Sequence, residues 1–360
     1  MRVLQLIDSL RSGGAERMSV TYANALAKRI DASYLCCTRM EGLLKADLSP
    51  RVGYLFLNKK STLDLKAFGE LRKLVKRNKI DLIQAHSSSW FLALLVKLSL
   101  SGVKLVWHDH YGRELKERKT GALQLASRYF DGIISVNADL KSWAEEKLNI
   151  KHVTFFRNFL SESNSISIPA KYPLLGGRGD DFKVLCLANL RPQKDHLNLL
   201  QAFDTVQKVH SQVSLHLLGK DKGDNYSNEL KDFVRRNGLE SKVFFYGEQP
   251  NVQELLLQAD LGVLSSVSEG LPLALLEYGR AGLPVVCTAV GECPEVIGTT
   301  GLLVAPLDSG ELSNAILSYL KNTKERKTAA ENYRKKIMEQ FSEKAVIPGT
   351  INFYEKILAK

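Results

Sequence analysis

Two glutamates eight positions apart are the strongest candidates for chemistry in this chain. Glu269 lies in a loop before a predicted helix, and Glu277 lies about two turns inside that helix among apolar residues. A sheltered carboxylate needs hydrogen-bond partners, and ligand hydroxyl groups would supply them. The backbone N–H groups of Gly270 and Leu271 stand at the predicted helix start. Paired carboxylates also suggest acid/base hydrolysis, but the intervening loop and two turns do not imply a facing pair.

The segment from Asn189 to Lys194 is a candidate anion site. It opens the first predicted helix of the second half of the chain and contains two cations, Arg191 and Lys194. Two cations beside a helix N-terminus would bind a diphosphate through fixed charge and aligned backbone donors. The alternative is an ordinary solvated pair, which is the usual state of surface lysine and arginine.

Glycines 13 and 14 follow the first predicted strand and precede a predicted helix. Gly13 and Gly14 would let the backbone approach a ligand closely, and the helix would offer free N–H groups to an anion. The pattern is not the dinucleotide fingerprint, because no acidic residue follows at the ribose-binding distance. A plain strand-to-helix turn explains the glycines equally well.

Histidines cluster at the ends of two predicted neighbouring strands. His108 and His110 follow one strand and His86 ends the one before it. The carboxyl edge of a parallel sheet is where ligands bind in open α/β folds. The His-x-His spacing suggests a metal, but we expect no third or fourth ligand nearby, so a hydrogen-bonding role is favoured. A histidine turn with no chemistry is the alternative.

Short β-branched runs alternate with helical patterns through both halves of the chain. The first half has predicted strands at residues 3–7, 34–38, 54–57, 82–85, 104–107 and 132–136, and predicted helices at 15–29 and 64–78. The second half has predicted strands at 183–187, 214–218, 243–246, 261–264 and 284–287. Polar and glycine-rich residues at 161–165 and 175–181 interrupt the rhythm as a linker would. The pattern predicts an α/β protein with two doubly wound parallel sheets.

The charge of the chain is concentrated in its first half. The 360 residues have a formal net charge of +11, and residues 1–160 contain 27 Lys and Arg against 15 Asp and Glu. Such a surplus indicates an anionic partner. Five cysteines without a C-x-x-C pair fit reduced, buried residues of a cytoplasmic protein. We expect no signal peptide, no membrane-spanning segment and no structural metal.

Taken together, these motifs resemble the GT-B-fold glycosyltransferases of the retaining family 4 type. The resemblance depends on the E-x7-E motif from Glu269 to Glu277, together with the early glycines, the Lys194 turn and the segments 290–296 and 300–304, which appear in family order. It implies two Rossmann-like domains facing across a cleft. We place the N-terminal acceptor-side domain at 1–165, a linker at 166–182 and the nucleotide-sugar-binding domain at 183–342. A helix at 343–360, with its apolar pattern at about residues 346–358, is expected to pack back on the N-terminal domain.

The resemblance assigns roles to the candidate residues. Glu277 would bind the ribose hydroxyls, Glu269 the hydroxyls of the transferred sugar, and Lys194 the leaving diphosphate. The amides of Gly270 and Leu271 would lie beside the sugar and the diphosphate. The family's usual arginine five residues before the lysine is replaced by Asn189, and Arg191 would reach the same phosphate from another point.

On the N-terminal side, the resemblance places Gly13 and Gly14 near the diphosphate. His110 would face the donor sugar, with His108 as a reserve, and His86 is a further candidate at the same edge. The sequence contains no Asp-x-Asp motif for a metal, so Lys194 and Arg191 would replace the metal. We therefore expect no metal and no cofactor.

These roles predict an enzyme that transfers a sugar from a nucleotide-sugar donor to a glycan or lipid-linked acceptor. A UDP-sugar is favoured over a GDP-sugar as the donor. The expected pathway is the synthesis of cell-surface polysaccharide, such as O-antigen or capsule. The basic first half would bind an anionic membrane from the cytoplasmic side, through exposed lysines and arginines: Lys66, Arg72, Lys73, Lys76, Arg77, Lys79, Arg113, Lys116, Arg118 and Lys119. A solvated basic face is the alternative, and no nucleic-acid-binding pattern accompanies the charge. Other candidates are a GT-B sugar-nucleotide epimerase, a synthase with a soluble acceptor, and a nucleotide-sugar-binding protein without catalysis.

Overall fold

The chain folds into two compact units. The computed structural model describes residues 1–359 apart from 12, 112–117, 149, 162–173 and 250–251. The N-terminal unit comprises Met1–Ser163 together with Phe341–Lys360, and the C-terminal unit comprises Asn164–Gln340. The last stretch of the chain therefore belongs to the same unit as the first.

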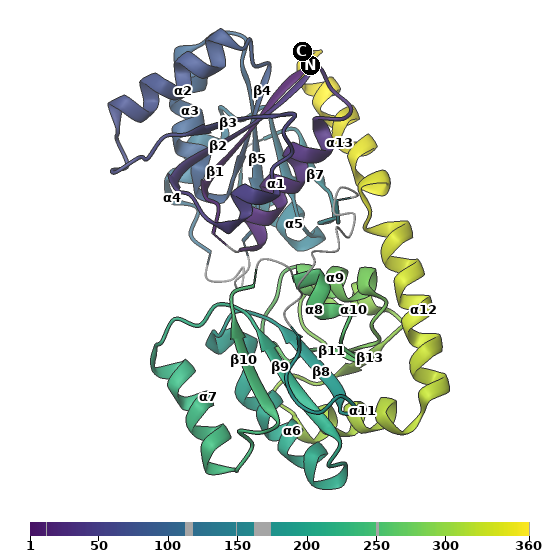
Figure 1. The fold of residues 1–360 in the computed structure, drawn as a ribbon. Coiled ribbons are helices and arrows are strands. Elements are labelled where there is room, and N and C mark those ends of the chain that lie inside the picture. The colour runs from purple at the N-terminus through teal and green to yellow at the C-terminus, as the bar shows by residue number, and fades with distance from the viewer. Residues whose placement is uncertain (12, 112–117, 149, 162–173, 250–251, 360) are drawn as a thin grey trace. The chain divides into compact units, whose positions relative to one another are not determined.

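A seven-stranded parallel sheet forms the centre of the N-terminal unit (Figure 1). Its strands are β1 (Arg2–Ser9), β2 (Ala32–Met40), β3 (Val52–Phe56), β4 (Leu82–His86), β5 (Lys104–Asp109), β6 (Gly132–Ser135) and β7 (Val153–Phe155). They lie in the order β3-β2-β1-β4-β5-β6-β7. All five residues of β4 are buried, as expected for a strand covered on both faces. The six predicted strands are confirmed, and β7 was not predicted.

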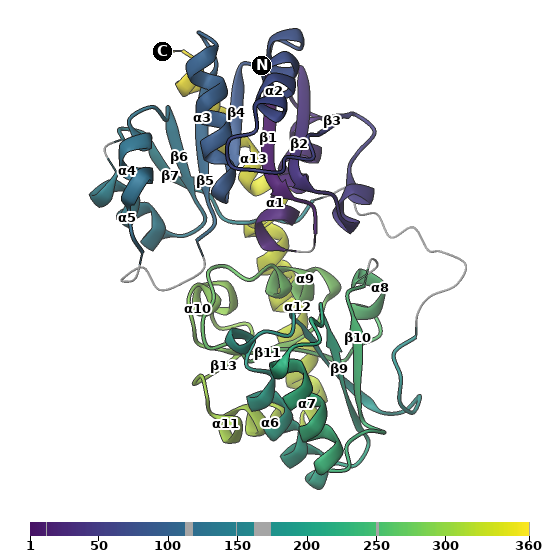
Figure 2. The same ribbon diagram turned by 90° about the vertical axis from the view of Figure 1, so that its left-hand side faces the viewer.

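Helices cover both faces of this sheet. They are α1 (Gly14–Leu26), α2 (Leu65–Arg77), α3 (Trp90–Ser99), α4 (Gly121–Ser127), α5 (Ala138–Lys147) and α13 (Glu343–Leu358). In Figures 1 and 2, α2 and α3 lie on one face of the sheet and α1 and α13 on the other. Leu71 and Val75 of α2 pack into the core with strand residues, as the amphipathic pattern predicts.

The C-terminal helix begins earlier than its proline suggests. The fully buried Glu343, at the start of α13, forms ion pairs with Lys28 and Arg29 just after α1. Pro348 lies inside α13, where its missing N–H removes a single helical hydrogen bond. The helix therefore runs through Pro348, and it starts at Glu343, the first residue of the segment expected at 343–360.

The C-terminal unit repeats the same arrangement with six strands. They are β8 (Phe182–Leu187), β9 (Val213–Leu218), β10 (Val243–Gly247), β11 (Leu261–Leu264), β12 (Val285–Thr288) and β13 (Leu302–Val304), in the order β10-β9-β8-β11-β12-β13. The helices are α6 (His196–Val209), α7 (Asn225–Arg236), α8 (Val252–Leu256), α9 (Leu273–Ala281), α10 (Cys293–Ile297), α11 (Ser309–Lys321) and α12 (Thr323–Gln340). The five predicted strands are confirmed, and β13 was not predicted. Both units are doubly wound α/β folds.

The described part of the expected linker is bonded to the C-terminal unit. The N–H of Leu175 donates to Gln258 at 3.0 Å, and the N–H of Gly176 donates to the Tyr246 hydroxyl at 2.6 Å. Asp181 is ion-paired with Lys242 at 3.0 Å. These contacts place residues 174–181 in the C-terminal unit, and residues 166–173 lie outside the described residues.

Within the described chain, no helix is both long and apolar enough to cross a membrane. The five cysteines are buried and free, as predicted.

Each sheet has one topological switch point, between β1 and β4 in the N-terminal unit and between β8 and β11 in the C-terminal unit. Connections leave these neighbouring strands in opposite directions, and open α/β sheets bind ligands outside the carboxyl ends of the strands at such points. The candidate residues lie at or after the carboxyl ends of β1, β4, β5, β8 and β11, with His86 the last residue of β4 and His108 the last but one of β5. Both halves therefore present their candidate side chains where this fold binds ligands.

Candidate functional site

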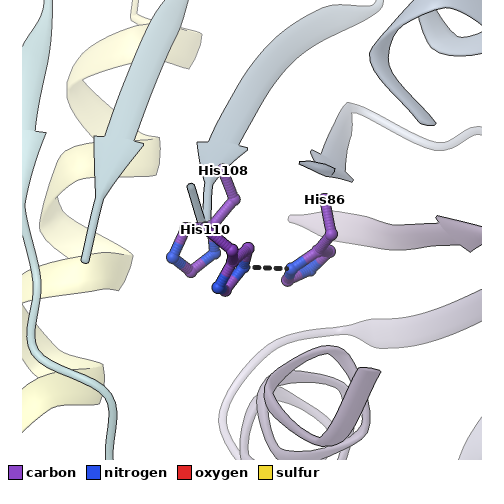
Figure 3. A group of neighbouring side chains, drawn as sticks. All are labelled: His86, His108 and His110. Atoms are coloured by element: carbon purple, nitrogen blue, oxygen red, sulfur yellow. Dashed lines mark hydrogen bonds between the residues drawn. The ribbon is translucent and has the colours of Figure 1, made fainter. Parts of the chain in front are cut away.

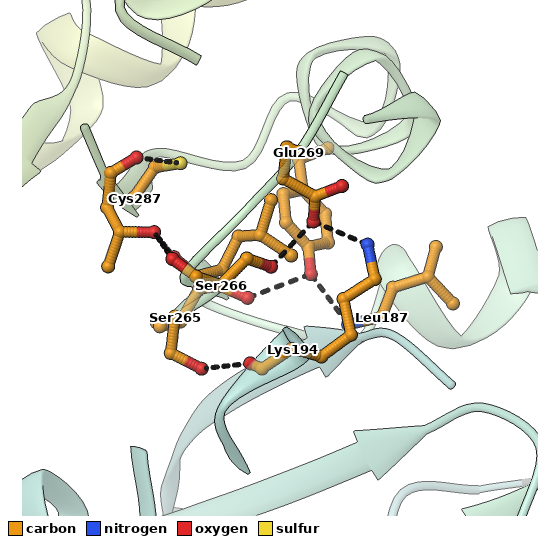
Figure 4. A network of polar contacts seen from close by, with 10 residues as sticks. Leu187, Lys194, Ser265, Ser266, Glu269 and Cys287 are labelled. Carbon is orange, nitrogen blue, oxygen red and sulfur yellow. Dashed lines mark hydrogen bonds and ion pairs between the residues drawn. The ribbon is translucent and has the colours of Figure 1, made fainter. Parts of the chain in front are cut away.

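In the C-terminal unit, the loops after β8 and β11 bring Lys194 and Glu269 into an ion pair (Figure 4). The ammonium of Lys194 donates to Oε1 of Glu269, and the hydroxyl of Ser266 donates to the same oxygen at 2.6 Å. The side chain of Glu269 is 8% exposed and that of Lys194 is 19% exposed. Two residues that the sequence separates by 75 positions thus form one charged centre.

Backbone and hydroxyl contacts fix the two loops against each other. The Ser265 hydroxyl donates to the Lys194 carbonyl at 3.0 Å, and the N–H of Val267 donates to the Gln193 carbonyl at 3.0 Å. Asp195 has a φ of 46° and caps the start of α6. A left-handed aspartate beside the charged centre is strained and persists only where its surroundings over-determine it.

The helix that contains Glu277 is anchored to the sheet. The hydroxyl of Tyr278 accepts from the N–H of Leu187 at 2.7 Å and donates to the carbonyl of Val263 at 3.1 Å. Tyr333 of α12 donates to the carbonyl of Leu275 at 2.8 Å. Glu277 is the fifth residue of α9 and is buried, so it lies about one turn inside the helix rather than two.

The amino end of α9 differs from the predicted start. The helix begins at Leu273 with Pro272 before it and no side-chain cap, so Gly270 and Leu271 precede the helix. Gly270 accepts the N–H of Glu292 at 3.0 Å. Gly291 has a φ of 51°, and a Cβ there would lie 2.1 Å from the Glu269 carbonyl. Only glycine fits at this contact, which ties the loop after β12 to the Glu269 loop.

The remaining residues of the cation turn do not join this centre in the described structure. The side-chain oxygen of Asn189 accepts the N–H of Lys220 at 2.8 Å, which is a structural role. Arg191 is exposed and precedes the short turn Pro192–Lys194. Lys194 is therefore the cation that the fold positions, and Arg191 is a surface cation beside it.

In the N-terminal unit, three histidines meet at the carboxyl ends of β4 and β5 (Figure 3). His86 Nδ1 lies 2.9 Å from His110 Nε2, and the rings of His108 and His110 are 4.1 Å apart. His86 thus places a third histidine nitrogen beside His108 and His110, where no third potential metal ligand was expected. The ligand nitrogens of the three residues all lie within 4.8 Å of one another.

These histidines are neutral near physiological pH. His86 and His108 are buried, and burial lowers the pKa of both rings well below the ordinary value, because a charged ring would lose its hydration. Burial also lowers the pKa of His110 to about 3. Neutral rings act as paired donors and acceptors rather than as cations.

A buried ion pair positions the start of the loop that follows β5. The guanidinium of Arg118 makes two hydrogen bonds to Asp109, at 2.6 and 2.9 Å, and lies over the rings of Trp143 and Tyr111. The expectation that Arg118 belongs to a surface cluster is wrong, because its side chain is 7% exposed. Arg113 and Lys116 lie outside the described residues.

The two glycines of the first loop, Gly13 and Gly14, differ in how closely neighbouring atoms approach them. Gly13 is the N-cap of α1 and makes no side-chain cap. A Cβ on Gly13 would lie 2.2 Å from the Glu16 carboxylate, whereas a Cβ on Gly14 would meet nothing within 4 Å. Packing in the described structure therefore does not require glycine at position 14.

Comparison with known proteins matches both units. A family model described as Glycosyltransferase Family 4 matches residues 12–161, and one described as Glycosyl transferases group 1 matches residues 175–336. This chain is a GT-B glycosyltransferase of the family 4 type.

The glycosyltransferase has relatives with named activities. It is 23% identical over 299 residues to the UDP-Gal:alpha-D-GlcNAc-diphosphoundecaprenol alpha-1,3-galactosyltransferase of Escherichia coli, covering 78% of this chain and 76% of that one. It is 31% identical over 185 residues to the N-acetyl-alpha-D-glucosaminyl L-malate synthase of Bacillus anthracis, which is 51% of this chain and 48% of the relative.

Among solved structures, Anabaena Alr3699/HepE in complex with UDP and glucose matches the glycosyltransferase with a TM-score of 0.80. Sequence identity is 20%, and the match covers 99% of this chain and 100% of that chain. At this identity the likeness establishes the fold, and it confirms the predicted GT-B architecture.

The polar partners beneath the candidate residues were not predicted from the sequence. Gln5 and Gln84 lie inside otherwise apolar strands, and Ser265 and Ser266 directly follow β11. A buried amide in an apolar strand needs partners, so the two glutamines were a readable signal. The pairing of Lys194 with Glu269 had no local signal.

Proposed function

We propose that this glycosyltransferase is a retaining, metal-independent enzyme that moves a sugar from a UDP-sugar to a glycan or lipid-linked acceptor in cell-surface polysaccharide synthesis. The observation that carries the proposal is the Lys194–Glu269 pair at the switch point of the C-terminal unit. It supplies a positioned cation and a positioned carboxylate where this fold binds ligands.

The leaving diphosphate explains the cation. Breaking the bond between the sugar and the β-phosphate develops negative charge on the phosphate, and a preorganised cation stabilises that charge. The Lys194 side chain is mostly buried, and its loop is hydrogen-bonded to the loop after β11. The ammonium group is therefore held in place before the donor binds. Arg191, exposed on the same turn, would add charge to the same phosphate.

The carboxylates explain sugar and ribose binding. Carboxylate oxygens accept hydrogen bonds from hydroxyl groups, and a donor has hydroxyls on both the sugar and the ribose. Glu269 would accept from the transferred sugar and Glu277 from the ribose. The backbone amides of Gly270 and Leu271, close to the uncapped end of α9, would donate to the sugar and the diphosphate.

The N-terminal unit would contribute His110 to the donor sugar and Gly13 and Gly14 to the diphosphate. The space around Gly14 is open, so a phosphate could approach its backbone. His110 is neutral, so it would accept or donate a hydrogen bond without adding charge. No metal or cofactor takes part in this proposal.

The names of relatives support the donor and acceptor classes. The galactosyltransferase of Escherichia coli is named for a UDP-sugar and a diphosphoundecaprenol acceptor, and a relative from Campylobacter jejuni, 27% identical over 284 residues, is named for an undecaprenol-linked acceptor. A lipid-linked acceptor would require this enzyme to work at the cytoplasmic face of the membrane.

Helix α2 and the turn before it form the surface that fits such a membrane. Leu63 and Leu65 are 70% and 84% exposed at the start of α2. Five exposed cations follow them along the helix and its end: Lys66, Lys73, Lys76, Arg77 and Lys79. Apolar side chains beside clustered cations bind anionic bilayers, with each cation contributing ~1 kcal/mol near the surface.

Donor specificity and metal independence are tested together. A thermal-shift panel of UDP- and GDP-sugars identifies the donor, and hydrolysis of that donor is then measured with and without EDTA. We expect a UDP-sugar to stabilise the protein and to be turned over in EDTA. Activity that disappears in EDTA and returns with a divalent cation would refute the metal-free mechanism.

Membrane binding is tested with vesicles containing phosphatidylglycerol at moderate salt. The charge reversals Lys73→Glu and Lys76→Glu should abolish co-sedimentation, and Leu65→Ser should weaken it. Arg235→Glu and Arg236→Glu on α7 of the C-terminal unit provide the matched control, because these two residues are exposed cations on a helix of similar length. Equal loss with the control pair would show that only net charge matters.

A soluble acceptor is the second candidate, and one comparison favours it. The Bacillus anthracis relative is named for L-malate, a small anion, and it has the highest identity of the three curated relatives described above. Product formation with a panel of hydroxy acids and no lipid acceptor would support this alternative.

A further inference from the structure

A buried polar network lies beneath His110, on the face of the N-terminal sheet that α1 and α13 cover. Gln5 of β1 and Gln84 of β4 are register partners in the parallel sheet, and neither is exposed. The Gln5 amide nitrogen donates to the Gln84 amide oxygen at 3.3 Å, and Tyr354 of α13 donates to that same oxygen. Burying amides is costly without partners, and here each amide also contacts a histidine.

The network continues from Gln5 to His110 through His86. His86 Nε2 lies 2.7 Å from the Gln5 amide oxygen, and His86 Nδ1 lies 2.9 Å from His110 Nε2. An amide oxygen only accepts hydrogen bonds. The proton of neutral His86 must therefore be on Nε2, which leaves Nδ1 without a proton and able to accept.

The same logic assigns the tautomer of His110. Because His86 Nδ1 accepts, the proton of His110 must be on Nε2, and its Nδ1 is then the bare nitrogen. Nδ1 of His110 has no partner among the described residues and is not one of the fully buried atoms. This bare nitrogen lies at the carboxyl edge of the sheet, directly after β5.

We propose that Gln5 and His86 are positioning residues that hold His110 in one neutral tautomer, so that its bare Nδ1 accepts a hydrogen bond from a hydroxyl of the donor sugar. The second part of this inference rests on the proposed function. Glycosyl transfer builds positive, oxocarbenium-like charge on the sugar. A neutral acceptor binds the sugar without opposing that charge, whereas an imidazolium would oppose it.

The same three histidines could instead be considered as metal ligands, since their nitrogens lie close together. Both nitrogens of His86 are already engaged, one by Gln5 and one by His110. The rings of His86 and His110 are also nearly parallel, with 21° between their planes, rather than directed at a common point. This geometry favours the hydrogen-bonded relay.

The proposal is tested by NMR of the full chain labelled with ¹⁵N only in its seven histidine rings. Ring nitrogens with and without a proton have widely separated ¹⁵N shifts, so the spectrum gives each tautomer directly. At neutral pH we expect His110 and His86 to have protonated Nε2 and bare Nδ1. A protonated Nδ1 on His110, or ring nitrogens bound to a stoichiometric metal, would overturn the assignment.

Two variants separate positioning from folding. Gln5→Met keeps the side-chain length and removes the acceptor, and we expect His110 to become a mixture of tautomers while the protein stays folded by circular dichroism. His86→Asn retains an acceptor oxygen close to the position of Nδ1, and we expect it to keep the His110 tautomer. An unchanged His110 spectrum in Gln5→Met would overturn the positioning role.

The ligand contact is tested on the same sample. Adding the stabilising UDP-sugar should shift the Nδ1 resonance of His110, and kcat for its turnover should fall at least ~10-fold in Gln5→Met with KM little changed, because the lost contact acts at the reacting sugar. If the tautomer is as assigned and a bound sugar nucleotide leaves Nδ1 unmoved, the contact is refuted. If no sugar nucleotide binds at all, the proposed function fails while the tautomer result stands.

Discussion

Lowering the pH from 7.5 to 5.5 should destabilise the N-terminal unit through its buried histidines. His86 and His108 are 0% and 1% exposed, and burial lowers the pKa of each well below its ordinary value of 6.5. In the unfolded chain both rings return to a pKa of about 6.5. Below that value the unfolded state binds more protons than the folded state, so the free energy of unfolding falls as the pH falls.

The magnitude follows from the unfolded pKa, because burial lowers the folded pKa of both rings well below it. Each ring that stays neutral in the folded state lowers the free energy of unfolding by about 1.4 kcal/mol between pH 7.5 and 5.5. His86 and His108 together should contribute about 3 kcal/mol, and His110 adds a loss of the same sign. Most carboxylates remain ionised above pH 5.5, so they contribute little in this window.

Tryptophan fluorescence measures the unfolding of the N-terminal unit separately from that of the C-terminal unit. All three tryptophans of the chain, Trp90, Trp107 and Trp143, lie in the N-terminal unit. Urea titrations at the two pH values therefore report the unfolding of that unit without interference from the other. His108→Phe keeps a ring of similar shape, and we expect it to reduce the pH-dependent loss by about 1.4 kcal/mol.

A non-titrating variant provides the control. Ile83→Val lies in the buried core of β4 and should cost about 1 kcal/mol at both pH values, which leaves the pH-dependent difference unchanged. If wild type and His108→Phe lose the same free energy between pH 7.5 and 5.5, the reasoning about neutral buried histidines is wrong.

Three further predictions concern single side chains. Lys194→Met should reduce kcat for donor turnover by ~100-fold or more while leaving the protein folded, because Glu269 keeps the Ser266 hydroxyl as a partner; a loss below 3-fold would contradict the diphosphate role. Gly14→Ala should leave the melting temperature unchanged or slightly raised, since the added Cβ meets no atom within 4 Å. The same variant should lower donor turnover. Unimpaired turnover would show that Gly14 is part of an ordinary turn without a role in diphosphate binding. Arg118→Met should destabilise the N-terminal unit by roughly 3–5 kcal/mol because it leaves Asp109 buried without its cation. Urea unfolding followed by tryptophan fluorescence measures this loss, and a clearly smaller value would contradict the prediction.

The fold was largely predictable because strands buried on both faces are nearly continuous apolar runs. β4 is such a run, and strands of this kind alternate with amphipathic helices. The strands that were missed, β7 and β13, have three residues each and are mostly only half-buried, so their local pattern is weak. Pro348 lies inside α13, and the ion pairs of the buried Glu343 hold the turn of helix that precedes it.

The candidate site was predictable in its parts and not in its assembly. Motif position alone placed Lys194 and Glu269 at strand ends, but their ion pair depends on the order in which β8 and β11 lie in the sheet. The contact between His86 and His110 also depends on strand order, because β4 and β5 are neighbours in the sheet and His86 is in register with His108. Such contacts arise from the sheet as a whole and leave no trace in sequence spacing.

The anomeric configuration of the sugar released from the donor tests the central claim most directly. The purified enzyme is incubated in EDTA with the UDP-α-sugar that stabilises it, and proton NMR follows the first sugar that appears, with Lys194→Met as the control. The account predicts turnover that begins with the α-anomer and is lost in the control. A β-anomer appearing first, or equal turnover by Lys194→Met, would contradict it.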